Sequence, residues 1–158
     1  MTFVDFLNLI FSGNNLALLG AALATFMAGI GSAKGVNLVA KASAGLLTED
    51  PSKFGKTLAL QALPMTQGIY GFVVAFRIIS LVGATPNLDI SQGAYYLMAS
   101  LPIAIVGFYS GIKQGEVAAA GVSVLAKRPN ELGKVITSAA LVETYAVLAV
   151  LISLLLVF

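Results

Sequence analysis

Residues 132–158, LGKVITSAALVETYAVLAVLISLLLVF, form an apolar run as long as a membrane-spanning helix. One acidic side chain, Glu143, lies deep inside this run. A carboxylate near the centre of a bilayer is costly, and it is kept where it forms a pair, coordinates an ion or carries protons. Glu143 is therefore the first candidate functional residue.

The rest of the chain has the same character, because 58% of its 158 residues are hydrophobic and only 10% are charged. Further apolar runs lie near residues 16–47, 54–82 and 91–125, separated by loop-like residues 48–51, 84–87 and 127–130. The runs are continuous and rich in Ala, Leu and Gly, which favours helices over an alternating β-barrel. We predict an all-α membrane protein with four transmembrane helices, preceded by an interfacial segment at residues 1–12.

Composition also excludes several classes of function. The chain has no Cys and no His, which excludes thiolate chemistry, haem and typical zinc sites. The net charge is only +2, and no basic run with interleaved aromatic residues is present. We therefore expect a lipid bilayer and no nucleic acid as partners.

The sequence repeats itself after 78 positions without a gap. The shift superposes residues of helices and loops alike: Gly29 on Gly107, Ser32 on Ser110, Pro51 on Pro129, Gly55 on Gly133, Lys56 on Lys134 and Thr66 on Thr144. Such a period indicates a duplicated helical hairpin. We predict two tandem repeats, residues 13–83 and residues 91–158.

Basic residues set the expected orientation. Six of the nine lie at or near the two hairpin loops: Lys41, Lys53, Lys56, Lys127, Arg128 and Lys134. The positive-inside rule places both loops in the cytoplasm, so the termini and the connection around Pro86 face outward. Lys34 and Lys113 lie deeper on the same halves of the first and third helices. Arg77 is the exception, and we expect it to extend toward the outer interface.

The first helix of each repeat carries small residues at a spacing of about four: Gly20, Ala24, Ala28, Gly31 and Gly35, then Gly107, Gly111 and Gly115. Such faces let helices approach closely. Packing inside a four-helix protomer and a tight inner ring of many copies are both compatible with this spacing.

Polar side chains converge at one depth. Glu143 lies 12 residues past Glu131, and Gln114 lies 11 before Leu125. Thr66 and Gln67 lie 13 and 14 residues past Lys53. Each distance corresponds to roughly 17 to 21 Å of helix. The predicted helices at residues 54–82, 91–125 and 132–158 can therefore bring these groups together.

The second predicted helix, residues 54–82, adds further groups at that depth. Leu63, Thr66, Gln67 and Tyr70 share one helix face, and Pro64 can free a backbone oxygen nearby. A carboxylate, two amide oxygens, a hydroxyl and a carbonyl suit a hard cation, and this number of oxygens favours Na⁺ over a proton. The alternative is that Thr66, Gln67 and Gln114 only hydrogen-bond helices to one another.

Three motifs resemble a known family: LPMTQGIYGF at residues 63–72, SGIKQG at 110–115 and VETYA at 142–146. They are similar to the duplicated 16 kDa proteolipid, the c-type rotor-ring subunit K, of bacterial V-type sodium ATPases. The similarity extends from about Leu16 to the C-terminus.

The resemblance implies a rotor ring of identical subunits in the bacterial plasma membrane, contacting a stator membrane subunit and a central-stalk subunit. It implies one Na⁺ per subunit, held by Glu143, Gln114, Thr66, Gln67 and the backbone oxygen of Leu63, with Tyr70 hydrogen-bonding the carboxylate. Met65 departs from the family pattern, which has Gly there, and Arg77 departs from an apolar residue.

We therefore expect a non-catalytic, ion-translocating subunit of a V-type ATPase, with ATP hydrolysis in other subunits. Two alternatives remain at this point. One is a ring of the same architecture that carries H⁺, and the other is a structural, pore-forming membrane oligomer.

Overall fold

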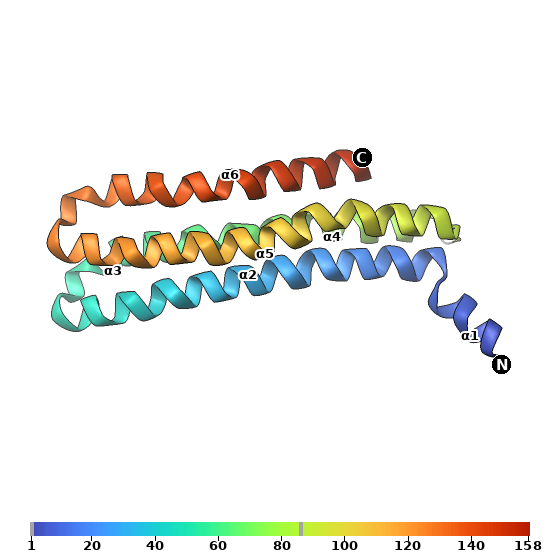
Figure 1. Ribbon diagram of the computed structural model, residues 1–158, viewed down its shortest axis with the longest axis horizontal. Helices are drawn as coiled ribbons and strands as arrows, with labels where there is room; N and C mark the ends of the chain where they lie inside the picture. Colours follow the sequence, from blue (N-terminus) through green and yellow to red (C-terminus); the bar gives the residue numbers. More distant parts are fainter. Residues whose placement is uncertain (1, 86) are drawn as a thin grey trace.

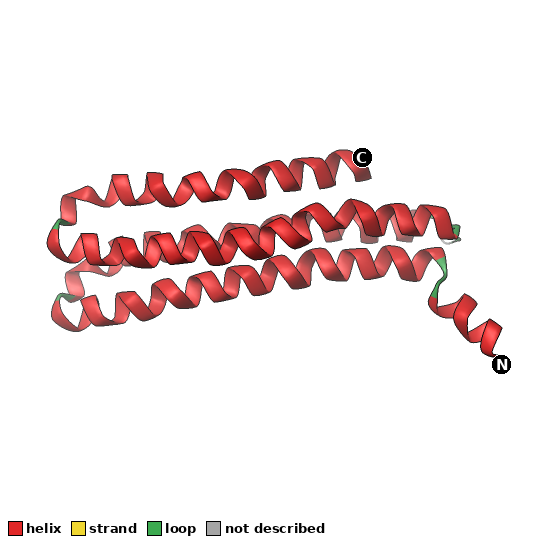
Figure 2. Cartoon of the chain, in the orientation of Figure 1, coloured by secondary structure: helices red, strands yellow, loops and turns green. Residues whose placement is uncertain are grey.

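The computed structural model describes residues 2–85 and 87–158, and of Asn8 and Leu9 only the backbone. All the described elements are helical, as Figure 2 shows. They are α1 (Phe3–Ile10), α2 (Gly13–Glu49), η1 (Pro51–Lys53), α3 (Phe54–Ala62), η2 (Leu63–Met65), α4 (Thr66–Ala84), α5 (Ile90–Lys127), η3 (Pro129–Glu131) and α6 (Leu132–Val157). Four segments are long and apolar enough to cross a membrane: Gly13–Glu49, Pro51–Ala84, Ile90–Lys127 and Pro129–Val157.

The two hairpin turns are tighter than the sequence suggested. Residues 48 and 49 continue α2, and Pro51 opens a 3₁₀ turn instead of a loop. Pro129 does the same after α5. Proline suits this place because it has no N–H to leave unsatisfied at the start of a helix. The predicted connection at residues 84–87 includes Pro86, which lies outside the described residues.

Polar caps close the turns. The Asp50 side chain accepts the Ser52 N–H at 3.0 Å and pairs with Lys53 at 3.2 Å. The hydrogen bond from Ser52, followed by the one from Lys53, lowers the pKa of Asp50. The Lys56 ammonium donates to the Pro129 carbonyl at 2.7 Å, which ties the two turns to each other.

The long helices form one elongated bundle (Figure 1). α2 packs along α5, α4 packs against α2 and α5, and α6 lies against α5 and α4. Both hairpin turns lie at one end of the bundle, and both termini lie at the other. The short α1, closed by a Thr2–Asp5 capping box, projects away from the bundle. This polarity fits the predicted orientation with both turns on one side of the membrane.

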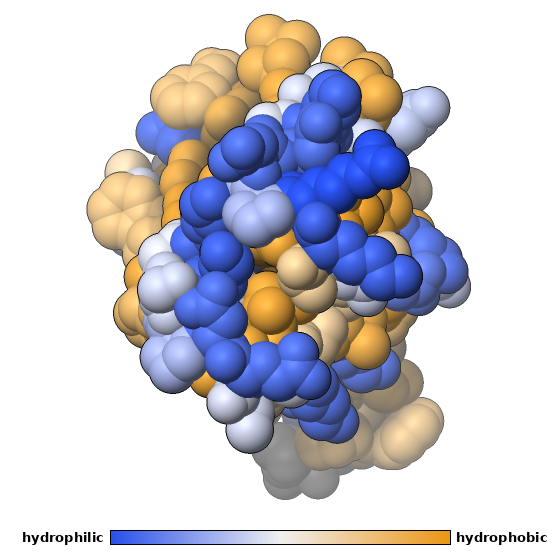
Figure 3. Space-filling view, turned by 90° about the vertical axis from the view of Figure 1, so that its left-hand side faces the viewer, coloured by the Kyte–Doolittle hydropathy of each residue, from blue (hydrophilic) through white to orange (hydrophobic). Residues whose placement is uncertain are grey.

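Figure 3 views the end that carries the hairpin turns. Hydrophilic side chains gather there around an apolar interior. Four basic residues lie in or next to the two hairpin turns at this end: Lys53, Lys127, Arg128 and Lys134. Basic residues at a polar end fit the predicted cytoplasmic position of the turns, which stays a prediction.

The core has two hydrophobic clusters with a polar layer between them. The cluster toward the termini includes Ala24, Val74 and Ile103, and the cluster toward the turns includes Val39, Leu60 and Ala118. Buried Ser32, Gln67, Ser110 and Gln114 fall between them along their helices. The predicted depth of the site is therefore where the bundle core becomes polar.

Glycines allow α2 and α5 to pack backbone to backbone. A Cβ added at Gly111 would lie 2.8 Å from the carbonyl carbon of Gly31, and one at Gly20 would lie 2.8 Å from the Cα of Leu97. Neither position has room for a larger residue. The small-residue faces are thus used for packing inside the protomer, and the same protomer leaves Gly29 open.

Candidate ion-binding site

The helix that carries half of the predicted site is broken at Pro64. Pro64 is fully buried and forms the 3₁₀ turn η2 between α3 and α4. The Thr66 N–H and the Thr66 hydroxyl both donate to the Leu63 carbonyl, the hydroxyl at 3.1 Å. Because the hydroxyl donates there, its lone pairs remain available, and the two predicted oxygens of Thr66 and Leu63 lie side by side.

Gln67, Gln114 and Glu143 form a chain of hydrogen bonds across α4, α5 and α6. Gln67 Nε2 donates to Gln114 Oε1 at 2.6 Å, and Gln114 Nε2 donates to Glu143 Oε2 at 3.2 Å. Both glutamines are completely buried. The predicted convergence of polar groups from three helices is therefore present in the structure.

Tyr70 completes the surroundings of the carboxylate. Its hydroxyl donates to Glu143 Oε1 at 2.6 Å. Each carboxylate oxygen thus accepts one hydrogen bond, from Tyr70 or from Gln114. The carboxylate of Glu143 is therefore held in place by side chains of both α4 and α5.

Among the described residues two buried side-chain atoms have no hydrogen-bond partner, Ser43 Oγ on α2 and Gln67 Oε1 in this cluster. Gln67 Oε1 is inaccessible to solvent and forms no hydrogen bond. An unsatisfied buried oxygen costs about 1–3 kcal/mol. A cation placed beside it would remove this cost, so the donor set fits a bound cation better than it fits interhelical hydrogen bonding alone.

Ser110 fixes the orientation of that amide, and its role in the site was missed from the sequence. Its hydroxyl accepts from Gln67 Nε2 at 3.3 Å and donates to the Val142 carbonyl at 3.2 Å. Both N–H groups of Gln67 are therefore used, by Ser110 and Gln114, which leaves the oxygen as the free atom. The sequence offered one hint of this role, because the 78-residue repeat aligns Ser110 with Ser32. The repeat alone did not indicate that Ser110 contacts the site.

Ser32 has a different task in the first repeat. Its hydroxyl accepts the Gly68 backbone N–H at 2.8 Å and so joins α2 to the start of α4. The repeat places Met65 where Glu143 stands, and Met65 is 51% exposed on the outside of the bundle. The first hairpin therefore contributes Gln67 and Tyr70 to this cluster of side chains but no carboxylate.

Arg77 lies away from this site. Its Nε donates to the Val157 carbonyl at 3.1 Å, and its guanidinium carbon lies 4.6 Å from the centre of the Phe158 ring. A cation at the C-terminal end of α6 complements the helix dipole. Arg77 thus fastens α4 to the end of α6 and does not compete for Glu143.

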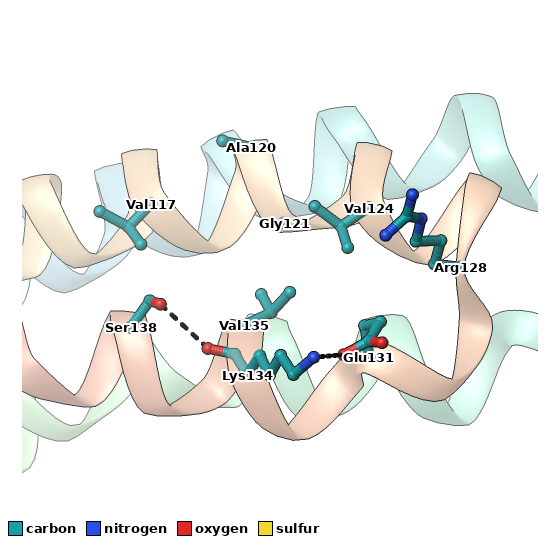
Figure 4. A pocket seen from close by; sticks show the side chains of 9 residues that line it. All are labelled: Val117, Ala120, Gly121, Val124, Arg128, Glu131, Lys134, Val135 and Ser138. Carbon is teal, nitrogen blue, oxygen red and sulfur yellow. Dashed lines mark hydrogen bonds and ion pairs between the residues drawn. The ribbon is translucent and has the colours of Figure 1, made fainter.

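A cavity of about 400 Å³ lies between α5 and α6 near the hairpin turn (Figure 4). In that view Lys134 pairs with Glu131 and Ser138 donates to the Lys134 carbonyl. The cavity contains none of the predicted site residues. The carboxylate instead borders a shallow groove on the other side of α6, lined by Ala140, Thr144, Val147 and Leu148.

The sequence matches the family of ATP synthase C subunits twice, over residues 19–78 and 97–156. The chain belongs to this family. The two tandem matches confirm the predicted duplicated hairpin of an all-α, multi-pass membrane protein, while the boundaries 13–83 and 91–158 stay predictions.

Two relatives place the chain within this family. The V-type sodium ATPase subunit K of Enterococcus hirae is 53% identical over 145 residues, covering 92% of each chain. The A-type ATP synthase subunit K of Methanocaldococcus jannaschii is 38% identical over 141 residues, covering 89% of this chain and 61% of the relative. The predicted resemblance to subunit K proteolipids, the ion-translocating rotor-ring subunits, is confirmed.

Proposed function

We propose that this member of the ATP synthase C-subunit family carries one Na⁺ per chain across the membrane, in a rotor ring driven by ATP hydrolysis in other subunits. The observation that carries the proposal is the unpartnered Gln67 Oε1, in an amide that is connected through Gln114 to the Glu143 carboxylate. The name of the Enterococcus hirae relative, a sodium ATPase subunit, supports the choice of ion.

The proposed ligands are those that the resemblance implied. They are the Glu143 carboxylate, the side-chain oxygens of Gln67 and Gln114, the Thr66 hydroxyl and the Leu63 carbonyl. Gln114 Oε1 accepts from Gln67 in the structure, so ion binding exchanges this hydrogen bond for a bond to the ion. Hard oxygen donors of this kind suit Na⁺.

Charge balance explains how the site crosses the lipid. One Na⁺ neutralises one carboxylate, and a neutral site is far less costly in hydrocarbon than a bare charge. Glu143 is half-buried and its outer side borders apolar side chains. The occupied site can therefore rotate through the bilayer, and the ion leaves where the ring meets a stator subunit.

The unpartnered amide oxygen supports Na⁺ over H⁺. Both oxygens of Glu143 accept a hydrogen bond, from Tyr70 and from Gln114. A protonated Glu143 needs only one acceptor, which the Tyr70 hydroxyl supplies, so these two bonds fit either ion. The free Gln67 oxygen has no role for a proton on Glu143, whereas it is a suitable ligand for Na⁺.

The remaining parts of the proposal concern position and partners. Both hairpin turns face the cytoplasm of a bacterial plasma membrane, where they contact a central-stalk subunit. Identical subunits form the ring, and the chain itself performs no ATP chemistry. The hydrophilic end in Figure 3, together with the basic residues Lys53, Lys127, Arg128 and Lys134 at the hairpin turns, supports this orientation.

Carbodiimide labelling of the purified protein at a fixed, mildly acidic pH tests the choice of ion. The reagent attacks a protonated carboxyl, so bound Na⁺ protects the carboxyl of its site. We expect Na⁺, and not K⁺, to suppress the labelling of Glu143 in a titration followed by mass spectrometry. Glu116, whose carboxylate pairs with Lys113 at 3.0 Å, is the internal control that Na⁺ leaves unchanged. Labelling that depends on pH but not on Na⁺ would replace Na⁺ with H⁺.

A further inference from the structure

The helix α4 begins at Thr66, inside the membrane-spanning segment Pro51–Ala84. The first N–H groups of a helix have no α-helical acceptor, and hydrocarbon offers no water in place of one. The residue at the N-cap position is Met65, whose side chain forms no capping hydrogen bond. The start of α4 therefore depends on an acceptor from another helix.

Ser32 on α2 supplies this acceptor. Its hydroxyl oxygen accepts the Gly68 N–H at 2.8 Å. Gly68 is the third residue of α4, and the N–H at this position is one that an N-cap side chain commonly binds. Ser32 is buried, with 6% of its surface exposed, so the bond is shielded from solvent. Ser32 thus caps α4 from a neighbouring helix.

Close contacts on both sides of this hydrogen bond fix the position of α4 along α2. A Cβ on Gly35 would lie 2.6 Å from the Pro64 Cβ. A Cβ on Gly71 would lie 2.7 Å from the Ala28 Cβ. Ser32 lies between Ala28 and Gly35 on α2, so its hydrogen bond forms the middle of three successive contacts between two antiparallel helices.

The second hairpin uses the equivalent serine differently. Ser110, which the 78-residue repeat aligns with Ser32, donates to the Val142 carbonyl at 3.2 Å. Val142 is the equivalent of Pro64, and α6 continues through this place without a break. The capping role of Ser32 therefore belongs to the broken helix of the first hairpin.

The two serines hold Gln67 at opposite ends. The N–H that Ser32 accepts belongs to the peptide bond between Gln67 and Gly68. Ser110 accepts from the other end of the residue, the amide Nε2, at 3.3 Å. The Leu63 carbonyl belongs to the turn that directly precedes α4. A shift of the capped peptide bond therefore moves the proposed ligands at the start of α4.

We propose that Ser32 is a positioning residue of the Na⁺ site, because its cap fixes the start of α4 and with it the ligands of that helix. The inference rests on the proposed function and goes beyond it by assigning ion selectivity to a side chain that is not one of the proposed ligands. Selectivity between cations of different size depends on the size and the rigidity of the site. Without the cap, the ligands of α4 can approach a smaller ion such as Li⁺, so discrimination against Li⁺ falls.

Thermal dissociation of the purified ring, in separate titrations of Na⁺ and Li⁺, tests this role. The readouts are the two midpoints of protection and their ratio. Ser32→Ala is expected to raise the Na⁺ midpoint by about 2-fold to 12-fold, the equivalent of one hydrogen bond, and to raise the Li⁺ midpoint less. Ser32→Cys, which has a similar size and a weak acceptor, is expected to lie between Ser32→Ala and the wild-type protein.

Ser43→Ala is the matched control. Ser43 lies on the same helix and is 1% exposed, and within the described part of the chain its hydroxyl oxygen has no hydrogen-bond partner. This variant therefore removes a buried hydroxyl from α2 without removing a cap. It is expected to keep both midpoints and their ratio at the wild-type values.

Hydrogen–deuterium exchange of the Na⁺-free ring observes the cap itself. Residues 66–72 at the start of α4 are expected to exchange faster in Ser32→Ala than in the wild-type protein, because the N–H of Gly68 has lost its acceptor. The repeat provides an internal control, since residues 144–150 are the equivalent segment of the unbroken α6. Their exchange is expected to stay unchanged.

The outcomes separate this inference from the proposed function. If Na⁺ protects the wild-type ring, and an assembled Ser32→Ala or Ser32→Cys ring has the wild-type midpoints and ratio, the inference is overturned and the proposed function stands. A loss of stability that is equal with and without Na⁺, at an unchanged ratio, also overturns it, because Ser32 would then have a structural role alone. A wild-type ring that Na⁺ does not protect overturns both.

Discussion

Replacing Gln67 by Leu is predicted to weaken Na⁺ binding while leaving the Na⁺-free protein nearly as stable as before. Gln67 Oε1 is buried without a partner, at a cost of about 1–3 kcal/mol that bound Na⁺ removes. Leucine has a similar size and no oxygen, so this part of the binding free energy is lost. Each 1.4 kcal/mol corresponds to a factor of ten, which gives about 5-fold to 150-fold weaker binding.

Two terms nearly cancel in the Na⁺-free protein. The variant loses the unsatisfied Gln67 oxygen, which is favourable. It also leaves Gln114 Oε1 and Ser110 Oγ without the Gln67 donor, which lies at 2.6 Å and 3.3 Å, and this is unfavourable. Both terms are of the same order, about 1–3 kcal/mol. The thermal stability of the Na⁺-free ring is therefore expected to change little, and the stabilisation by added Na⁺ is expected to move to higher concentrations.

The assay is thermal dissociation of the purified ring across a Na⁺ titration, with the midpoint of Na⁺ protection as the readout. Gln61→Leu is the matched control, because it makes the same chemical change on α3, outside the site. A Gln67→Leu protein with a wild-type Na⁺ midpoint would refute the reasoning, because the unpartnered oxygen would then not be a ligand.

Three further changes separate positioning, packing and anchoring. Ser110→Ala removes one anchor of the Gln67 amide and should weaken Na⁺ binding by about 0.5–1.5 kcal/mol in the same titration, whereas Ser110→Thr should restore it. Gly111→Val forces side-chain atoms into the α2 backbone and should lower the ring's dissociation temperature strongly, while Gly133→Val, at an open position, should not. Arg77→Gln loses the cation–π contact with the Phe158 side chain and the hydrogen bond to the Val157 carbonyl. The free energy of unfolding should therefore fall by about 1 kcal/mol, with an unchanged Na⁺ midpoint.

The sequence was sufficient for the architecture because each part of it depends on a local or periodic signal. Apolar length predicted the four spans, the 78-residue period predicted the paired hairpins, and Pro64 predicted a local distortion of the second span. Counting residues from the loops placed Glu143, Gln114 and Gln67 at one level, and their hydrogen bonds confirm it.

Other features depend on side-chain orientation, which counting residues does not reveal. The orientation of the Gln67 amide follows from Ser110 on another helix, so its free oxygen became visible only with the helices packed. Arg77 was expected near the outer interface, but its partner, the end of α6, depends on how α4 and α6 pack. The helical turns at Pro51 and Pro129 replaced predicted loops because a 3₁₀ turn satisfies backbone groups that a loop would leave to water.

The central claim is that each chain binds one Na⁺ through Glu143. Equilibrium binding of radioactive Na⁺ to the purified ring, counted per chain, tests this claim without depending on ATP hydrolysis or rotation. We predict one Na⁺ per chain for the wild-type protein, none for Glu143→Gln, and one for the control Glu116→Gln in an intact ring. Unchanged Na⁺ binding by an assembled Glu143→Gln ring, or no saturable Na⁺ binding by the wild-type ring, would contradict the account.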